Sequence, residues 1–347
     1  MTQEIISTPL DSTLPTLPEV SEDEGELEAT AERRGLAVLA DAHGERIDRF
    51  LAQACPEFSR SYFQQLLDDG AVALNGRPVR KASTRLKAGE RLEVELRPTV
   101  QAQAFLPEPM ALQVVYEDEH LLVVDKPAGL VVHPAAGNWT GTLLNGLLAH
   151  HAGAARLPRA GIVHRLDKDT SGLMVVGKTQ QAVDALGGMI ARREVHRIYV
   201  ALAHGVWGAQ PEVLVDQPMG RDPRNRLRMA VLQGGVGTKE AQTRVRLLDH
   251  GAGYCWVGCK LHTGRTHQIR VHMAWLGHPL VGDAVYGGKP VLGLARQALH
   301  AVRLVFVHPV TSAVMNLESR LPPDIANALE TAGLHYNLNK LWRVDPA

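Results

Sequence analysis

The chain has 347 residues, and its 45% hydrophobic content is enough for a sizeable core, from which we expect two domains. No apolar run approaches the roughly 20 residues of a membrane-spanning helix, and no signal-like segment opens the chain, so we expect a cytoplasmic protein with no membrane partner. The 37 Lys and Arg residues balance 37 Asp and Glu residues, and the three sparse cysteines argue against a disulfide framework.

The net charge of zero hides an uneven distribution along the chain. Residues 1–32 contain nine acidic residues and no Lys or Arg, which leaves 37 basic against 28 acidic residues in the rest. Such an excess makes a polyanionic partner plausible. The acidic segment also has few large apolar residues and several prolines, and we expect residues 1–35 to be a disordered tail.

The segment 36–98 has the pattern of a small domain with two helices and a sheet. Apolar residues at helical spacing, ended by a proline, predict the first helix (Ile47, Phe50, Leu51, Ala54, Pro56). A capping-box spacing, an apolar stripe and a final glycine predict the second (Ser61, Gln64, Phe63, Leu66, Leu67, Gly70). Asn75-Gly76 predicts a hairpin between 71–74 and 77–79, and alternating residues predict a strand over 91–97.

This segment resembles the S4 RNA-binding domain. The likeness rests on four motifs: Arg46-Ile-Asp-Arg-Phe-Leu, Ser59-Arg-Ser, Val72-Ala-Leu-Asn-Gly and Leu86-Lys-Ala-Gly-Glu. The resemblance implies that basic side chains of the domain bind RNA phosphates, and the candidates are Arg46, Arg49, Arg60, Arg77, Arg80 and Lys81. The alternative is an ordinary charged surface, because the same segment also carries acidic residues.

Residues 99–111 read as an extended linker, and residues 112–347 as a second domain. Short apolar runs predict strands in it (112–116, 121–124, 130–132, 197–203, 241–249, 254–261 and 301–307), and Ala182, Val183, Leu186 and Ile190 predict a helix. Abundant strands with a few helices favour an α+β fold around a mostly antiparallel sheet.

The densest polar motif of the chain is Gly161-Ile-Val-His-Arg-Leu-Asp-Lys-Asp-Thr-Ser-Gly. It places Asp167 between Arg165 and Lys168, where nearby positive charge favours an ionised carboxylate. An ionised carboxylate can act as a nucleophile or a base. The alternative is a turn in which Asp167 or Asp169 bonds its own backbone.

A second polar cluster, residues 261–277, opens a predicted helix. We expect Thr266 as its N-cap and Gly277 as its end, with a buried stripe of Ile269, Met273 and Leu276. Arg265 and Arg270 could meet a phosphate or a carboxylate. The histidines at 262, 267, 272 and 278 match no compact zinc pattern, so we expect no metal; with Walker, GxSxG and well-placed GxGxxG motifs also missing, we expect no cofactor.

Five motifs in the same order resemble the RluA/RluD family of pseudouridine synthases, closest to the RluD branch. They are Lys126-Pro-Ala-Gly-Leu-Val-Val-His-Pro, His164-Arg-Leu-Asp-Lys-Asp-Thr-Ser-Gly-Leu, Arg197-Ile-Tyr-Val-Ala-Leu, Leu261-His-Thr-Gly-Arg-Thr-His-Gln-Ile-Arg-Val-His and Gly282-Asp-Ala-Val-Tyr-Gly-Gly. The likeness covers about residues 40–320. One departure is Arg197, where the family often has Lys, which keeps the charge.

The resemblance implies an isomerase that converts uridine to pseudouridine in RNA. Asp167 would be the catalytic aspartate, Tyr199 would stack on the target base, Arg270 would pair with Asp167, Arg165 would contact the RNA, and Leu261 would form part of the pocket wall. Ribosomal RNA of the large subunit or its precursor is the expected partner, with helix 69 of 23S rRNA as the target of the RluD branch, and a monomer is the default. Alternatives are a synthase for tRNA or another rRNA position, an RNA hydrolase that uses Asp167, and a non-catalytic ribosome assembly factor.

Overall fold

The computed structural model describes residues 32–97, 102–135, 137–208, 210–225, 227–235 and 237–343. Contacts within the chain divide it into two compact units, Met1–Thr99 and Val100–Ala347. The greater part of the expected acidic tail, residues 1–31, lies outside the described residues. Its last residues, 32–35, do not continue a tail, because they form part of strand β1, Glu32–Ala37.

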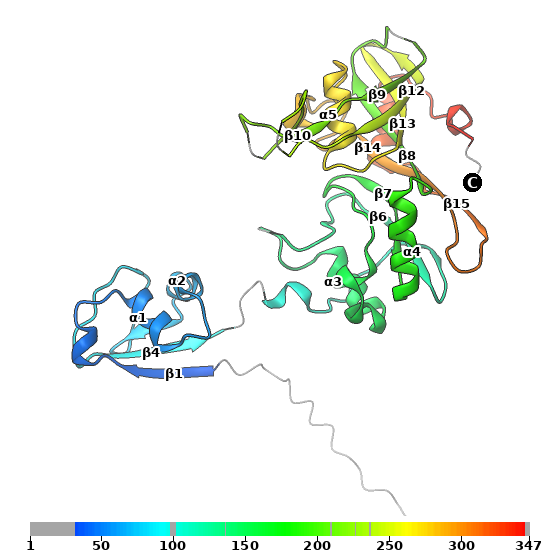
Figure 1. The fold of residues 1–347 in the computed structure, drawn as a ribbon. Coiled ribbons are helices and arrows are strands. Elements are labelled where there is room, and N and C mark those ends of the chain that lie inside the picture. Colours follow the sequence, from blue (N-terminus) through cyan, green and yellow to red (C-terminus); the bar gives the residue numbers. More distant parts are fainter. Residues whose placement is uncertain are drawn as a thin grey trace, which may run out of the picture. The chain divides into compact units, whose positions relative to one another are not determined.

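The first unit is a four-stranded sheet covered by two helices (Figure 1). The sheet has the order β1-β4-β2-β3, with β2 at Val72–Leu74, β3 at Arg77–Pro78 and β4 at Arg91–Leu96. The helices are α1, Ile47–Ala54, and α2, Arg60–Asp68, preceded by the short 3-10 helix η1, Ala40–Ala42. Both helices, the hairpin at Asn75-Gly76 and the alternation along β4 confirm the predictions for this segment.

The start of α2 differs from the predicted capping box. Ser59 is the N-cap, and its hydroxyl accepts from the backbone N–H of Tyr62 at 3.3 Å. Ser61 lies inside the helix, and Gln64 donates its amide to Asp48 at 2.9 Å instead of closing a box. The predicted N-cap is therefore wrong by two residues. Ser59 and Ser61 both carry a hydroxyl group that can cap a helix, and tertiary contacts decide which of them does.

The second unit is built on a nine-stranded, mostly antiparallel sheet, which confirms the α+β prediction. The order is β5-β6-β7-β14-β8-β13-β12-β9, and β15 pairs with β14; the short β7–β14 pair is parallel. The strands are β5 Val114–Glu117, β6 Leu121–Lys126, β7 Ser171–Gly177, β8 His196–His204, β9 Glu212–Asp216, β12 Gln242–Gly251, β13 Tyr254–Leu261, β14 Leu299–Val307 and β15 Val314–Glu318. A separate hairpin pairs β10, Met219–Arg221, with β11, Met229–Val231.

Helices flank this sheet in two groups (Figure 1). Helices α3, Leu143–His150, and α4, Gln180–Ala191, lie by β6 and β7, and α5, Gln268–Trp275, lies by β12 and β13. The remaining elements are α6, Pro323–Thr331, and the 3-10 helices η2 Ala102–Phe105, η3 Ala152–Arg156, η4 Pro158–Gly161, η5 Ala284–Tyr286 and η6 Leu338–Lys340. In the described part of the chain, none of the helices combines the length and apolarity needed to span a bilayer.

The second unit differs from the predictions at three places. Residues 130–132 form no strand; the carbonyls of Val131 and Val132 accept from the first turn of α3 instead. Helix α3 itself was not predicted, although Thr142 caps it through a capping box with Asn145. In the supposed extended linker, residues 102–105 form η2. Ala104 is buried, and its carbonyl accepts from the side-chain amide of Asn145.

Candidate active site

The loop between η4 and β7 carries Asp167, and its backbone is fixed from outside. The buried ammonium group of Lys126, the last residue of β6, donates to the carbonyl of Lys168 at 2.9 Å. Arg296 donates to the carbonyl of Asp169 at 3.0 Å. Burial lowers the pKa of Lys126 to about 8. Because the two residues that follow Asp167 are held through their carbonyls, the loop that carries its side chain is fixed at this point.

The Asp167 carboxylate is ion-paired with Arg270 on α5. Nη1 of Arg270 lies 3.1 Å from Oδ2 of Asp167, while Nε and Nη2 bind Asp283 at 2.7 and 2.8 Å. Burial alone would lower the pKa of Arg270, but hydrogen bonds and charge from Asp283, together with Asp167, raise it. Arg270 also lies over the ring of Tyr286, 5.0 Å from its centroid. The guanidinium is thus permanently charged and held from three sides.

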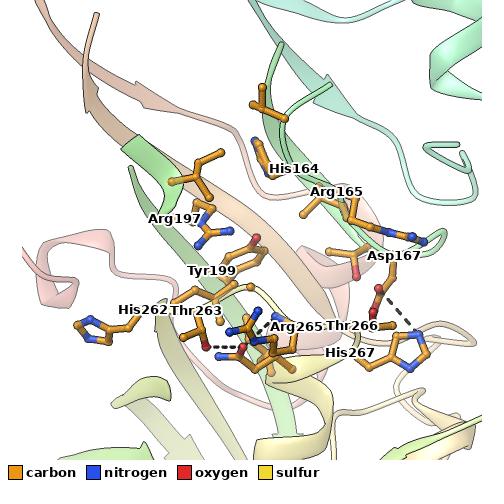
Figure 2. Close-up of a pocket in the computed structure, with 18 of the residues that line it drawn as sticks. His164, Arg165, Asp167, Arg197, Tyr199, His262, Thr263, Arg265, Thr266 and His267 are labelled. Atoms are coloured by element: carbon orange, nitrogen blue, oxygen red, sulfur yellow. Dashed lines mark hydrogen bonds and ion pairs between the residues drawn. The ribbon is translucent and has the colours of Figure 1, made fainter. Parts of the chain in front are cut away.

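His267 lies beside the Asp167 carboxylate in the same cavity (Figure 2). Its Nε2 is 3.9 Å from Oδ1 of Asp167, and its Nδ1 is 2.8 Å from the hydroxyl of Tyr286. That hydroxyl accepts from the backbone N–H of Met229 at 3.0 Å, which leaves its own proton for Nδ1. Burial lowers the pKa of His267 although the charge of Asp167 raises it. A neutral ring would then carry its proton on Nε2, toward Asp167.

Tyr199 forms part of the wall of the same cavity. It lies on β8 and is 4% exposed, with Cys259 and Ala301 as its partners in the neighbouring strands. Burial, with the charge of Asp167, raises the pKa of Tyr199 to about 12, against an opposing effect of Arg197. The phenol therefore stays protonated at neutral pH and offers an aromatic surface beside Asp167.

A cavity of about 430 Å³ brings the predicted residues together, since Asp167, Arg165, Tyr199, Arg270 and Leu261 all line it. Arg165 is exposed and Leu261 is half-buried. Among the described residues that line the cavity, Asp167 is the sole acidic one, and six are arginines: Arg159, Arg165, Arg193, Arg197, Arg265 and Arg270. The cavity suits a small planar group attached to a polyanion.

The predicted phosphate-binding residues of the first unit differ in whether their side chains are already bonded within the protein. Arg46 and Arg60 bind the buried carboxylate of Asp48 at 3.0 and 2.8 Å, and Arg49 pairs with Glu45 at 3.2 Å. Arg80 donates to the carbonyl of Asp68 at 2.8 Å. Within the described ranges, the side chains of Arg77 and Lys81 show no hydrogen bond or ion pair and are the most available for phosphate.

No role was predicted for Asp283 or Tyr286, and the predicted cap of α5 is wrong. Asp283 and Tyr286 stand in Gly282-Asp-Ala-Val-Tyr-Gly-Gly, where two polar residues between glycines could have indicated a site. The N-cap is His267 rather than Thr266, and it adopts a left-handed φ of 58° with no side-chain cap. Strain of this kind is concentrated at functional sites. Another histidine of the cluster, His272, is buried and bonded to Thr243.

Comparison with known proteins shows what the two units are similar to. A model of the RNA pseudouridylate synthase family matches residues 120–275, and one of the S4 domain matches residues 45–92. The solved structure of human RNA pseudouridylate synthase domain containing 4 superposes with a TM-score of 0.52 at 23% identity, covering 65% of this chain and 94% of that one. This likeness supports the fold of the second unit.

Relatives of known name match along most of the chain. Ribosomal large subunit pseudouridine synthase D of Neisseria meningitidis serogroup A is 47% identical over 321 residues, which cover 89% of this chain and 84% of the relative. The protein of the same name from Xanthomonas campestris is 45% identical, covering 83% of this chain and 89% of the relative. An uncharacterized RNA pseudouridine synthase from Bacillus subtilis, YlyB, is 44% identical, covering 82% and 93%.

Proposed function

The chain belongs to the RNA pseudouridylate synthase family, and from that membership we propose that it isomerises uridines of large-subunit ribosomal RNA, with Asp167 as the catalytic carboxylate. Membership makes the protein an isomerase, and the separate match over residues 45–92 identifies its S4 domain. Both findings confirm the resemblances that the sequence motifs indicated. The target and the residue roles are the parts that we propose.

The ion pair between Asp167 and Arg270 is the observation that carries the proposal. It holds the Asp167 carboxylate at the wall of a cavity that several arginines also line, 3.1 Å from a guanidinium that two further contacts orient. Tyr199 offers an aromatic face in the same cavity. A fixed carboxylate, a flat wall and surrounding arginines are what a flipped uridine on an RNA strand requires.

The reaction breaks the N1–C1′ bond of uridine, turns the uracil, and joins C5 to C1′. An ionised Asp167 could add to C1′ or C6, or take the 2′ proton, and all three routes need the carboxylate oriented and deprotonated. Arg270 holds the carboxylate in place through their ion pair. Tyr199 would hold the uracil ring while it is detached, with Leu261 closing the wall, and Arg165 would contact the RNA.

Ribosomal RNA is the proposed substrate because relatives at 41–47% identity carry the name ribosomal large subunit pseudouridine synthase D. Within that RNA we propose uridines of the helix 69 stem-loop. The S4-like segment 36–98 would add phosphate contacts, for which Arg77 and Lys81 are best available, and these contacts would help to offset the cost of extruding a base.

Release of tritium from C5 tests the proposal directly. Ribosomal RNA labelled with tritium at uridine C5 is incubated with the native chain and with Asp167→Asn, because formation of the C5–C1′ bond expels the label into water. We expect release by the native chain and none by the variant, at equal RNA affinity. Sequencing of the product then maps the modified positions against helix 69.

Each other outcome points to a different function. Tight binding without release from free RNA or large subunits would favour an assembly factor. Release from tRNA but not from ribosomal RNA would reassign the substrate, and equal release by both proteins would show that Asp167 is the wrong carboxylate.

A further inference from the structure

Arg197 is a buried cation in the cavity wall, and the described residues provide it with no counter-ion. It is 7% exposed, and its buried Nε has no hydrogen-bond partner in the described part of the chain. Among the residues that the structure describes, no carboxylate lies within ion-pair distance of it. Arg270, the other buried arginine of the cavity, has two such partners, Asp167 and Asp283. Because an unpaired charge is unfavourable away from water, Arg197 is best explained by a ligand that supplies the missing acceptor.

The strand places Arg197 on the same face as Tyr199. Side chains alternate along a strand, so residues 197 and 199 of β8 point to one side and Ile198 to the other. Tyr199 and Ile198 accordingly belong to two different core clusters. Figure 2 shows Arg197 next to Tyr199 at the cavity. A group stacked on the phenol would therefore lie within reach of the guanidinium.

Gly264 provides the space in which the Arg197 guanidinium lies. A Cβ atom at position 264 would be 2.7 Å from Nη1 of Arg197, closer than such atoms approach. The backbone of Gly264 has no left-handed torsion that would itself require glycine. The missing side chain thus matters for the guanidinium and not for the loop.

We propose that Arg197 contacts the carbonyl oxygens of the uracil and stabilises the negative charge that the base carries while it is detached. This inference rests on the proposed function. When N1–C1′ breaks, the electron pair stays on N1 and spreads to O2 and O4. C5 then bonds to C1′ while the ester bond between Asp167 and C1′ breaks or, where Asp167 took the 2′ proton, while that proton returns to C2′. The proton on C5 leaves to water, and N1 takes up a proton. The charge arises whether Asp167 adds to C1′ or takes the 2′ proton. A guanidinium with no competing carboxylate is suited to neutralise it.

Rate and affinity measured separately test this role. For Arg197→Met we expect the single-turnover rate of tritium release to fall about 100-fold or more, with the Kd for RNA within about 3-fold of native. Arg197→Lys keeps the charge and should recover most of the rate. Gly264→Ala, which keeps Arg197 but displaces its guanidinium, should slow the reaction in the same way at unchanged Kd. Thermal unfolding of each variant monitors folding.

Sulfur substitution in the target uridine tests for direct contact. Sulfur accepts hydrogen bonds more weakly than oxygen, so 2-thiouridine or 4-thiouridine should slow the native chain at the oxygen that Arg197 contacts. Gly264→Ala, which tests the contact without relying on the folding of Arg197→Met, should shrink that difference. If neither sulfur effect depends on Arg197, the inference fails.

Results that contradict the role of Arg197 differ from those that would contradict the proposed function. A raised Kd with a smaller salt dependence and an unchanged rate would mean that Arg197 binds a phosphate. Rates near native for both Arg197→Met and Gly264→Ala would also overturn the inference while leaving the synthase intact. Failure of the proposed function would appear in the native chain, as no release of tritium at all.

Discussion

Asp283 occupies two of the three guanidinium nitrogens of Arg270, so that Nη1 alone is left for Asp167. The Asp283 carboxylate is 1% exposed and accepts from Nε and Nη2 at 2.7 and 2.8 Å. A bidentate pair fixes both the plane and the rotation of a guanidinium. Asp283, the N-cap residue of η5, therefore sets the direction from which Arg270 contacts Asp167, the candidate catalytic carboxylate.

Removal of the Asp283 charge should reduce turnover more than binding. In Asp283→Asn one acceptor remains and an amide faces the guanidinium, so Arg270 loses its fixed orientation. We expect kcat to fall about 10- to 100-fold, equivalent to about 1.4–2.8 kcal/mol, while the Kd for RNA stays within about 3-fold. Single-turnover tritium release and filter binding measure the two quantities.

A matched variant separates positioning from general loss of charge. Glu318→Gln removes one carboxylate from the ion pair between Arg303 on β14 and Glu318 on β15, away from the cavity lining. It should leave kcat unchanged. Equal losses in both variants, or a raised Kd with normal kcat in Asp283→Asn, would contradict a positioning role.

The sequence predicted most strands and the residues of the cavity, but not the contacts that orient them. Alternation and apolar runs located β8, β12 and β13 because their side chains face packed layers. The motif around Asp167 could be recognised from the sequence because charged residues rarely cluster between apolar strands. Asp283 and Arg270 are 13 residues apart, and no local pattern indicates that their side chains meet. The predictions of a cap at Ser61 and of a cap at Thr266 failed for the same reason, since neighbouring polar residues compete and tertiary contacts decide.

Two glycines of the second unit should respond oppositely to alanine. Gly172 on β7 has a φ of +114°, and a Cβ there would lie 2.3 Å from the carbonyl oxygen of Ala301. Gly187 lies on the exposed side of α4, with nothing within 4 Å of such an atom. We expect Gly172→Ala to lower the free energy of unfolding by at least about 2 kcal/mol, and Gly187→Ala to raise it by about 0.5–1 kcal/mol. Urea unfolding measures both; a neutral Gly172→Ala would show that β7 and β14 can separate freely.

His300 should make the protein less stable as the pH falls. It is 1% exposed, its Nδ1 lies 3.0 Å from the Ser171 hydroxyl, and burial lowers its pKa to about 4. The unfolded chain binds a proton near pH 6.5 and the folded one near pH 4, so stability is retained above pH 6.5 and lost between these values.

The variant His300→Gln removes this titration. In the native chain the free energy of unfolding falls between pH 7 and pH 5, and in the variant this fall should be smaller by about 2 kcal/mol. The comparison does not depend on how much stability the substitution costs at pH 7. Urea titrations at the two pH values give the difference. His250→Gln, the same change at an exposed position, is the control and should leave it as in the native chain; an unaltered difference in His300→Gln would refute the assignment.

Asp48 is the charged centre of the first unit. Its carboxylate is fully buried and accepts hydrogen bonds from Arg46 at 3.0 Å, from Arg60 at 2.8 Å and from Gln64 at 2.9 Å. Burial alone would raise the pKa of Asp48, but these bonds hold it well below its usual range. The network joins α1 to the start of α2, and it orders two arginines that are predicted to meet phosphates.

Asp48→Asn should therefore destabilise the first unit by about 2 kcal/mol at pH 7, because bonds to a charged acceptor are lost. The folded pKa is depressed, so the native advantage is complete above the unfolded value of about 3.9 and declines as the pH falls through it. Unfolding of the full chain, followed at pH 7 and pH 3, should show the gap between native and variant narrowing in acid. Asp68→Asn, at an exposed position, serves as the control. A gap that is constant with pH would mean that the loss comes from packing and not from the carboxylate's charge.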